Sequence, residues 1–552
     1  MSKWSRRRFL TTAASALPAF AAGCGTAPSR DTFPPACSPS PDPGVATIDV
    51  HTHVFNASDL QVSRFLTRVA ASEFSPILRE LIAALAPILE WAGWAFAPDG
   101  KTELDHLSGL SAKARVRGTV EFALADEIAR DREAGRQAFL NGFSEVLKRP
   151  EGERFLRAYD AHRQSVRAVA PRALQDREIF TLSMESMRAP EGLAAFTRAE
   201  QSLDGKRPLT FAANFFHYRY INALYLLENY GCVNGKVGIF ACHMVDFDYG
   251  LGALRSPPTT LDMQIEVMSR IHVLSQGRII PFAPFDPWRD YMEHGTALKR
   301  VKDAVATGKS LGIKLYPPMG FAPAGNAQVP RPSGWPSDPS FPAGLDNSMN
   351  TLFDWCAAEG VPVLAHANRT NAADQSFLDL GSPERWRQAI DAHKPLRICF
   401  GHFGGDCLLA HTMDCSNWAE GFLDAFSYGE YVYADWSYFE HVLPGDDRKA
   451  LVKRAKALFD KGGELARSRI AYGSDWLMLA IEPGAELYYS DFASLVGDLG
   501  QQFSRIAEQF FVKNGAQYLN LISGGATRRR IEQTFSRQGA RPSWLDAPQL
   551  KQ

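Results

Sequence analysis

Eight short apolar runs, separated by stretches with helical periodicity, constrain the fold of this 552-residue chain more than any other feature. Each run is apolar on both faces, as expected of a strand in a parallel sheet covered by helices. No glycine-rich phosphate turn follows the first run, which disfavours a doubly wound open sheet. The pattern predicts an α/β fold, a (β/α)8 TIM-like barrel, with strands at residues 47–53, 236–242, 278–283, 312–316, 361–366, 397–402, 431–435 and 469–473.

Two segments interrupt this alternation. Residues 60–208 carry helical periodicity and almost no strand signal, which predicts a large helical insertion after strand 1, over the mouth of the barrel. The insertion has two alternative roles: a lid that contacts the substrate, or a structural or dimerising element. Residues 317–347 are rich in proline and glycine and predict a long loop after strand 4. Helices are expected between strands, as at 297–309 and 349–359.

The first residues resemble a targeting signal. Residues 5–10 form a twin-arginine pattern, and residues 21–24 resemble a lipobox that ends in Cys24. We therefore expect a signal at 1–24, a Pro/Ser-rich linker at 25–44 and the folded unit at 45–552. Lipidation of Cys24 and an ordinary cleavage site beside a chance cysteine are the two alternatives. Either predicts an exported bacterial protein, periplasmic or anchored to the membrane as a lipoprotein.

Composition narrows the classes of partner. A formal net charge of −1 gives no basic surface for nucleic acid. The body of the chain has no apolar run long enough for a transmembrane helix, so a membrane contact is expected only through an anchor at Cys24. The cysteines form no C-x-x-C pair, which argues against a zinc ribbon. Cys407 and Cys415 are candidates for a disulfide that the sequence does not decide. The partner expected is a small-molecule substrate.

Metal-binding side chains stand at the ends of five predicted strands. Residues i and i+2 of a strand share one face, so His51 and His53 are placed to bind one ion. Carboxyl-terminal strand ends converge at one end of a barrel, and imidazole and carboxylate suit Zn²⁺ and similar divalent ions. The candidate metal ligands, over strands one, four, five, six and eight, are His51, His53, Lys314, His366, His402 and Asp475.

This pattern closely resembles the amidohydrolase superfamily, in particular its amidohydrolase-related branch, which includes metal-dependent hydrolases and decarboxylases. The resemblance covers residues 48 to about 520 without the insertion. It rests on five motifs: Asp49-Val50-His51-Thr52-His53, Gly312-Ile313-Lys314-Leu315-Tyr316-Pro317, Ala365-His366-Ala367, Gly401-His402-Phe403-Gly404 and Tyr472-Gly473-Ser474-Asp475-Trp476.

The resemblance implies two alternative metal schemes. In the first, His51, His53 and Asp475 hold one ion, His366 and His402 hold a second, and carboxylated Lys314 bridges them, as in dihydroorotases. In the second, His51, His53, His366 and Asp475 hold a single ion, and His402 acts on the substrate as acid or base. Lys314 favours the first scheme, because an unmodified ammonium group would repel divalent ions.

The predicted activity is hydrolysis by an exported enzyme, with Asp475 and His402 as catalytic residues. A metal-activated hydroxide attacks a C–N or C–O bond of an amide, lactam, lactone or ester, and Asp475 moves the proton. A metal-dependent decarboxylase on the same scaffold is the alternative, and a non-catalytic binding lipoprotein is a third reading. Arg369, Asn368 and Tyr316 are the candidate substrate-binding residues. The sequence names neither the substrate nor the oligomeric state.

Overall fold

The eight predicted strands form one sheet, in which every strand pairs in parallel with its neighbour and the order follows the chain from β1 to β8. The computed structural model describes residues 47–69, 76–117, 120–169, 191, 194–195, 208–233, 236–252, 255–408, 418–439, 442–443 and 448–551. The strands are β1 (Thr47–Thr52), β2 (Val237–His243), β3 (Ile279–Pro284), β4 (Gly312–Leu315), β5 (Val363–His366), β6 (Ile398–Gly401), β7 (Val432–Trp436) and β8 (Ile470–Tyr472).

The first and last strands close the sheet into a barrel. Strand β1 lies beside β8, and the Asp475 N–H donates to the His51 carbonyl oxygen at 2.7 Å. A second backbone hydrogen bond joins His53 N–H to the Trp476 carbonyl. The prediction of a (β/α)8 barrel is confirmed.

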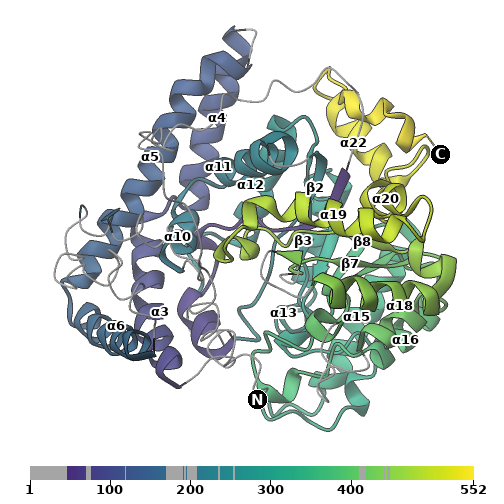
Figure 1. Cartoon of the computed structure of the whole chain (residues 1–552), viewed down its shortest axis with the longest axis horizontal. Coiled ribbons are helices and arrows are strands. Elements are labelled where there is room, and N and C mark those ends of the chain that lie inside the picture. The colour runs from purple at the N-terminus through teal and green to yellow at the C-terminus, as the bar shows by residue number, and fades with distance from the viewer. Residues whose placement is uncertain are drawn as a thin grey trace.

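Helices flank the strands around the barrel (Figure 1). They are α12 (Leu261–Leu274), α13 (Pro287–Met292), α14 (Thr296–Ala306), α15 (Phe341–Glu359), α16 (Pro383–Ala392), α17 (Trp418–Ala425), α18 (Arg448–Arg467) and α19 (Tyr488–Gly500), with α22 (Ala526–Ser536) near the C-terminus. One buried cluster joins strand residues such as Ile280 and Leu364 to Leu519 and Phe535, so the C-terminal segment belongs to the core of the barrel.

Two predicted boundaries near β5 are wrong. The loop expected over 317–347 is shorter, because α15 begins at Phe341 with Pro342 in its first turn, where the missing N–H has no intrahelical partner to lose. The strand expected from residue 361 begins at Val363. The Val361 N–H is bonded to the Cys356 carbonyl at the end of α15, and Pro362 has no N–H to give to the sheet.

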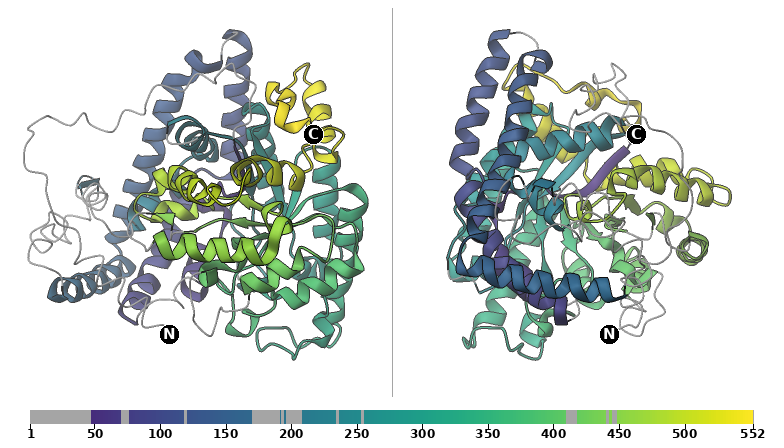
Figure 2. Two further views of the ribbon diagram at one scale, coloured as in Figure 1. Left: turned by 45° about the vertical axis from the view of Figure 1, so that its right-hand side comes forward. Right: turned by 60° about the vertical axis from the view of Figure 1, so that its left-hand side comes forward.

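The insertion after β1 is helical, as predicted, and has a core of its own. Helices α3 (Pro76–Phe96), α5 (Val120–Leu147) and α6 (Pro150–Val169) pack together around buried side chains such as Phe139, Phe143 and Phe155. Helix α4 (Gly100–Arg117) packs against α12. Helices α3 to α6 lie at one side of the barrel in all three ribbon views (Figures 1 and 2). The helical region continues beyond residue 208, through α10 (Pro208–Ala213) and α11 (Arg219–Tyr225) to a π-helical segment, η6 (Leu226–Val233).

A buried ion triad attaches the insertion to the barrel. The Arg219 guanidinium donates to Glu103 of α4 through Nε at 2.7 Å, and its Nη1 lies 3.3 Å from Asp59, just after β1. The side chains of all three residues are at most 2 % exposed. We call Asp59, Glu103 and Arg219 the ionic anchor.

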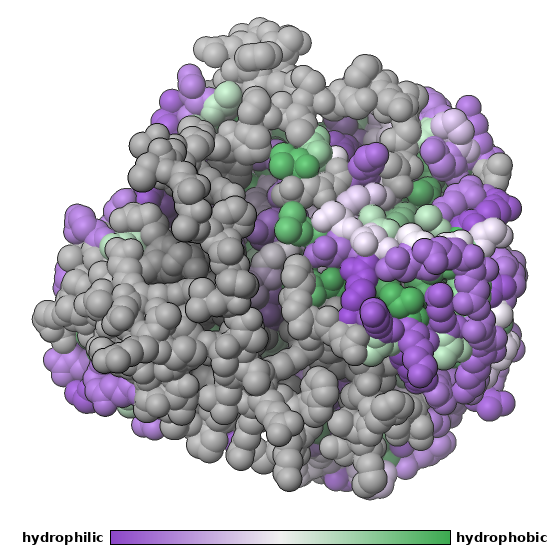
Figure 3. Space-filling model, viewed as in Figure 1, coloured by the Kyte–Doolittle hydropathy of each residue, from purple (hydrophilic) through white to green (hydrophobic). Residues whose placement is uncertain are grey.

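The surface of the barrel side is mainly polar. Purple, hydrophilic side chains dominate the right of Figure 3, with apolar ones scattered between them. The large exposed apolar residues of the described chain include Phe96, Val233, Met292, Leu465 and Leu487, which lie far apart in the sequence. Among the described residues, no helix combines the length and the hydrophobicity that a membrane crossing requires.

Candidate metal centre

The six predicted metal ligands gather at the carboxyl-terminal ends of the strands. His51, Lys314 and His366 lie within β1, β4 and β5, while His53, His402 and Asp475 follow the ends of β1, β6 and β8. All six are buried, none being more than 7 % exposed. We call these six residues the metal-site cluster.

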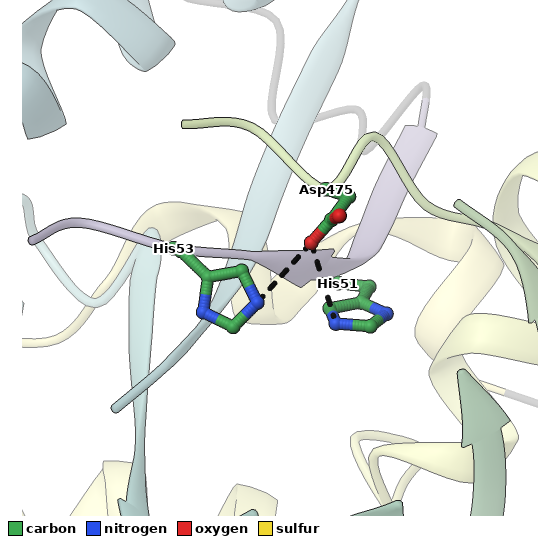
Figure 4. Close-up of side chains that lie close together, drawn as sticks. All are labelled: His51, His53 and Asp475. Atoms are coloured by element: carbon green, nitrogen blue, oxygen red, sulfur yellow. Dashed lines mark ion pairs between the residues drawn. The ribbon is translucent and has the colours of Figure 1, made fainter. Parts of the chain in front are cut away.

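Two histidines and one carboxylate form its compact part. Nε2 of His53 lies 3.2 Å and Nε2 of His51 lies 3.6 Å from the same oxygen of Asp475. Figure 4 shows both rings, one from β1 and one from the residue just after it, with these atoms directed at that oxygen. Among the described residues, these three are a group whose ligand atoms all lie within 4.8 Å of one another. That spacing fits one divalent ion held by two imidazoles and a carboxylate.

Hydrogen bonds at the far side of each ring select the nitrogen that is left for an ion. Nδ1–H of His53 donates to the His243 carbonyl at 2.7 Å. Nδ1–H of His51 donates to Asp435, 3.2 Å away. Both assignments put the proton on Nδ1 and leave the Nε2 lone pair facing Asp475. A carboxylate or carbonyl behind an imidazole is the arrangement that fixes metal-binding histidines in their tautomer.

Asp435 is a site residue that the sequence reasoning missed. It is the penultimate residue of β7, is fully buried, and accepts from His51, from the His402 N–H at 3.0 Å and from the Ser437 N–H at 3.1 Å. Burial raises its pKa, and the neighbouring His402 opposes that shift. A carboxylate at the end of the seventh strand was the signal that could have revealed it. Its position makes it a positioning residue for two predicted ligands.

Lys314 reaches directly into the compact part of the cluster. Its Nζ lies 3.0 Å from Nε2 of His51. Burial lowers the pKa of Lys314 to about 8, so a larger share of its amine is neutral near pH 7 than for an exposed lysine. A neutral amine is the form that can react with CO₂ to give a carbamate. The residue therefore fits the chemistry of a bridging carboxylated lysine.

His366 and His402 lie beside this group. Their ring centroids are 4.8 Å apart, and the centroid of His402 is also 4.8 Å from that of His51. Nε2 of His366 is buried without a hydrogen-bond partner among the described residues. Burial, followed by the charges of His402 and Lys314, lowers the pKa of His366 well below its usual value. A buried, neutral imidazole with an unsatisfied nitrogen is suited to a metal ion.

The backbone adopts a conformation that is unfavourable for non-glycine residues at two of these strand ends. His402 and Asp475 both have positive φ, 67° and 56°, a region that side chains other than glycine rarely adopt. Gly401 stands where a β-carbon would come within 2.8 Å of the His51 ring. The conformation of these strand ends therefore depends on the packing of the cluster around them.

The predicted substrate-binding residues have different surroundings. The Tyr316 ring stacks on that of His366, with centroids 4.2 Å apart. Asn368 packs against Gly405, whose missing side chain would lie 2.4 Å from its amide. Arg369 donates from Nε to Asp379 at 2.7 Å, at the surface. Of the three, Tyr316 contacts the metal-site cluster.

Other predicted features fall outside the described residues. These are the signal at 1–24, the linker at 25–44, Cys24, and Cys415 with its proposed link to Cys407. His243, the last residue of β2, also lies at the site, with its ring 5.2 Å from that of His51. Arg289 of α13 pairs with Asp246, Asp248 and Glu293.

No protein-family model matches the sequence, and no curated protein matches it. Solved structures do match. An amidohydrolase from Burkholderia multivorans with bound zinc is 12% identical, with 51% of this chain and 83% of that chain covered and a TM-score of 0.32. A probable 2-pyrone-4,6-dicarboxylic acid hydrolase from Acinetobacter baumannii is 13% identical, with 55% and 90% covered and a TM-score of 0.31.

A third match is 2,6-dihydroxybenzoate decarboxylase from Rhizobium, 15% identical, with 54% of this chain and 87% of that chain covered and a TM-score of 0.34.

Proposed function

We propose that this protein is a metal-dependent hydrolase of the amidohydrolase type. Its substrate is a small molecule with an amide, lactam, lactone or ester bond, in which a C–N or C–O bond is cleaved. The observation that carries the proposal is the buried convergence of His51, His53 and Asp475 beside Lys314. Histidine and carboxylate ligands, with no cysteine among them, favour Zn²⁺ or a similar divalent ion.

The donor atoms fit such an ion in two ways. His51, His53 and Asp475 would hold the first ion, with carboxylated Lys314 shared with a second ion on His366 and His402. Alternatively, His366 would join the first three around one ion. A bound divalent ion supplies acidified water and polarises a carbonyl group. The unpartnered Nε2 of His366 agrees with either arrangement.

The chain's own residues then handle the proton. Burial would raise the pKa of Asp475, but the contact with His53 and the charges of His402 and Lys314 outweigh it and hold the pKa below its usual value. Asp475 is therefore a carboxylate at neutral pH and can accept a proton from attacking water and pass it to the leaving group. His402, 7 % exposed and beside His366, is the second acid or base within reach of a substrate.

A metal-dependent decarboxylase is the second candidate. One group of ligands this compact occurs in the described chain, and three residues make it up. A single ion on His51, His53, His366 and Asp475 is the scheme expected of the decarboxylase branch. In that case the ion would bind the substrate carboxylate, and His402 would serve as the proton donor.

We also propose export through the twin-arginine route, with a lipid anchor at Cys24. The supporting observations are the residues themselves, the pattern at 5–10 and the lipobox-like residues 21–24. Fractionation of cells that produce the wild type, an R6K/R7K variant and Cys24→Ser tests this. The double lysine variant should stay in the cytoplasm, and Cys24→Ser should leave the membrane fraction. A wild type found in the cytoplasm contradicts the proposal.

Metal analysis tests the catalytic proposal. We expect about two equivalents of divalent metal per chain, and loss of metal and activity in Lys314→Met, which keeps the buried volume. Lys299→Met, at an exposed ion pair with Asp303, is the matched control and should behave as the wild type. If the wild type binds one equivalent of metal and Lys314→Met still binds it, the decarboxylase is favoured. A protein that binds no metal overturns both.

A further inference from the structure

The first residues of the insertion lie at the mouth of the barrel. Phe65 begins a π-helical turn, η2 (Phe65–Val69), directly after the short helix α2 (Val62–Arg64). Its ring stacks on Phe247 of the loop after β2, with centroids 5.5 Å apart and planes within 6°. Phe247 meets Tyr316 edge-on at 4.8 Å, and Tyr316 covers His366. An unbroken series of ring contacts therefore links this turn to the metal-site cluster.

Two arginines on either side of Phe65 converge on one point of the rim. A methyl group built on Gly252, in the loop after β2, would lie 3.5 Å from an Nη1 atom of Arg64 and 3.5 Å from an Nη1 atom of Arg68. Gly252 has a φ of +63°, where a side chain would be strained as well as in the way. The glycine thus leaves space in which two guanidinium groups approach each other.

These two charges are not neutralised within the described chain. No described carboxylate lies within ion-pair distance of either guanidinium group, whereas Arg289 of α13 has three acidic partners. Nη1 of Arg64 donates to the Leu251 carbonyl at 3.0 Å, which fixes its direction. Arg68 is exposed, and its charge reaches Asp374 in the loop after β5. Two like charges held together at a rim favour a bound anion.

Arg369, the arginine predicted to bind a substrate carboxylate, is already paired with Asp379. Arg64 and Arg68 carry the same chemistry without an ion pair to any described carboxylate, and they flank the ring that begins the series of aromatic contacts to the metal-site cluster. Guanidinium groups bind carboxylates through paired N–H donors better than any other side chain.

We propose that Arg64 and Arg68 form a carboxylate-binding subsite at the mouth, so that the substrate is an anion that carries a carboxylate remote from the bond that is cleaved. This inference rests on the proposed function, because the metal-site cluster receives the other end of the same molecule. It also gives the first turn of the insertion a role in substrate choice.

The experiment compares diacids with monoacids of equal length. Calorimetric titration of the metal-loaded, full-length protein uses glutarate, pimelate and azelate against valerate, heptanoate and nonanoate. We expect at least one diacid to bind about tenfold more tightly than its monoacid, as one additional charge-assisted contact provides. In the R64Q/R68Q variant this preference should disappear while monoacid binding is unchanged. Arg68→Gln alone, at an exposed position, should lose part of it.

Arg136→Gln is the matched control, because Arg136 is an exposed arginine of α5 that pairs with Glu133. It should keep the full preference for the diacid. The subsite is overturned if the metal-loaded wild type binds diacids and monoacids equally well. It is also overturned if the preference for diacids survives in R64Q/R68Q. Metal content is measured on the same samples, so absence of metal counts against the proposed function, whereas equal binding by metal-loaded protein counts against the subsite alone.

Discussion

The ionic anchor and the metal-site cluster are both buried and both include residues that follow β1, since His53 and Asp59 are six residues apart. Their polar atoms find partners in opposite ways. In the ionic anchor, the guanidinium of Arg219 has a carboxylate on each side, and its backbone N–H donates to Glu103 at 2.6 Å. In the metal-site cluster, the second nitrogens of His51 and His53 are bonded outward, while their Nε2 atoms face a single carboxylate.

The difference separates a structural cluster from a functional one. In the ionic anchor, the guanidinium group is paired with two carboxylates of the same chain, so we expect this cluster to act on stability and to fix the position of the insertion. The metal-site cluster leaves Nε2 of His366 without a partner and places the Lys314 amine against an imidazole. Both features are ones that the proposed metal ion would satisfy. We expect substitutions in the first to change unfolding, and substitutions in the second to change metal binding.

The largest expected effect is that of Asp475→Asn. Loss of the charged ligand and of the proton acceptor should lower the hydrolysis rate by about 10²- to 10⁴-fold and reduce bound metal. The free energy of unfolding of the metal-free protein should change far less. Rates and metal analysis of the purified variant measure this. Asp303→Asn, at an exposed ion pair, is the control. Full metal content in Asp475→Asn would contradict its place in the cluster.

In the ionic anchor, Arg219→Met should act on stability alone. It leaves Asp59 and Glu103 buried without a cation, which costs about 3–5 kcal/mol of unfolding free energy. Urea denaturation measures the loss, and the folded fraction should retain its metal. Arg136→Met removes an exposed pair and should cost about 1 kcal/mol or less. If Arg219→Met lowers the free energy of unfolding by an equally small amount, the insertion is held by its apolar contacts.

The substitution Asp435→Asn tests the carboxylate that accepts from His51 in the metal-site cluster. The amide keeps the shape but weakens the acceptor behind His51, so metal affinity should fall about 10- to 100-fold. Competition with a chelator measures this affinity. Asp391→Asn, at an exposed salt bridge with Lys394, should leave it unchanged. Loss of stability without loss of metal affinity would assign Asp435 a purely structural role.

The smallest effect concerns pH. Burial raises the pKa of Asp59 from 3.8 to about 7, against the opposing charge of Arg219. The folded form thus holds a proton that the unfolded form releases near pH 4. Stability from this group is full below pH 4 and declines as the pH rises towards 7. In metal-free protein, Asp59→Asn should flatten that decline in urea denaturation at pH 4 to 7. If the dependence of stability on pH is unchanged in Asp59→Asn, the decline comes from other groups. One such group is Asp49, whose pKa is raised to about 8 by burial.

The barrel could be predicted from the sequence, as could the gathering of the predicted ligands at one end of it, because both follow from local periodicity. His51 and His53 share a face through the strand repeat, and the other ligands stand at strand ends that a barrel must bring together. Asp435 was missed because its role depends on which ring lies across the barrel. Arg64 shows the same limit at the surface, since its partner Leu251 comes from the loop after β2 and is not fixed by spacing along the chain.

The closure of the barrel also sets the order of events in biosynthesis. The Asp49 carboxylate accepts from the N–H of Ser474, 425 residues later, and the neighbouring Asp475 completes the ligand group. While a ribosome is still making the last strand, the nascent chain has both histidines but not their carboxylate. The complete group of two histidines and one carboxylate therefore forms only after Asp475 has been made, so its assembly is a late event in the synthesis and folding of the chain.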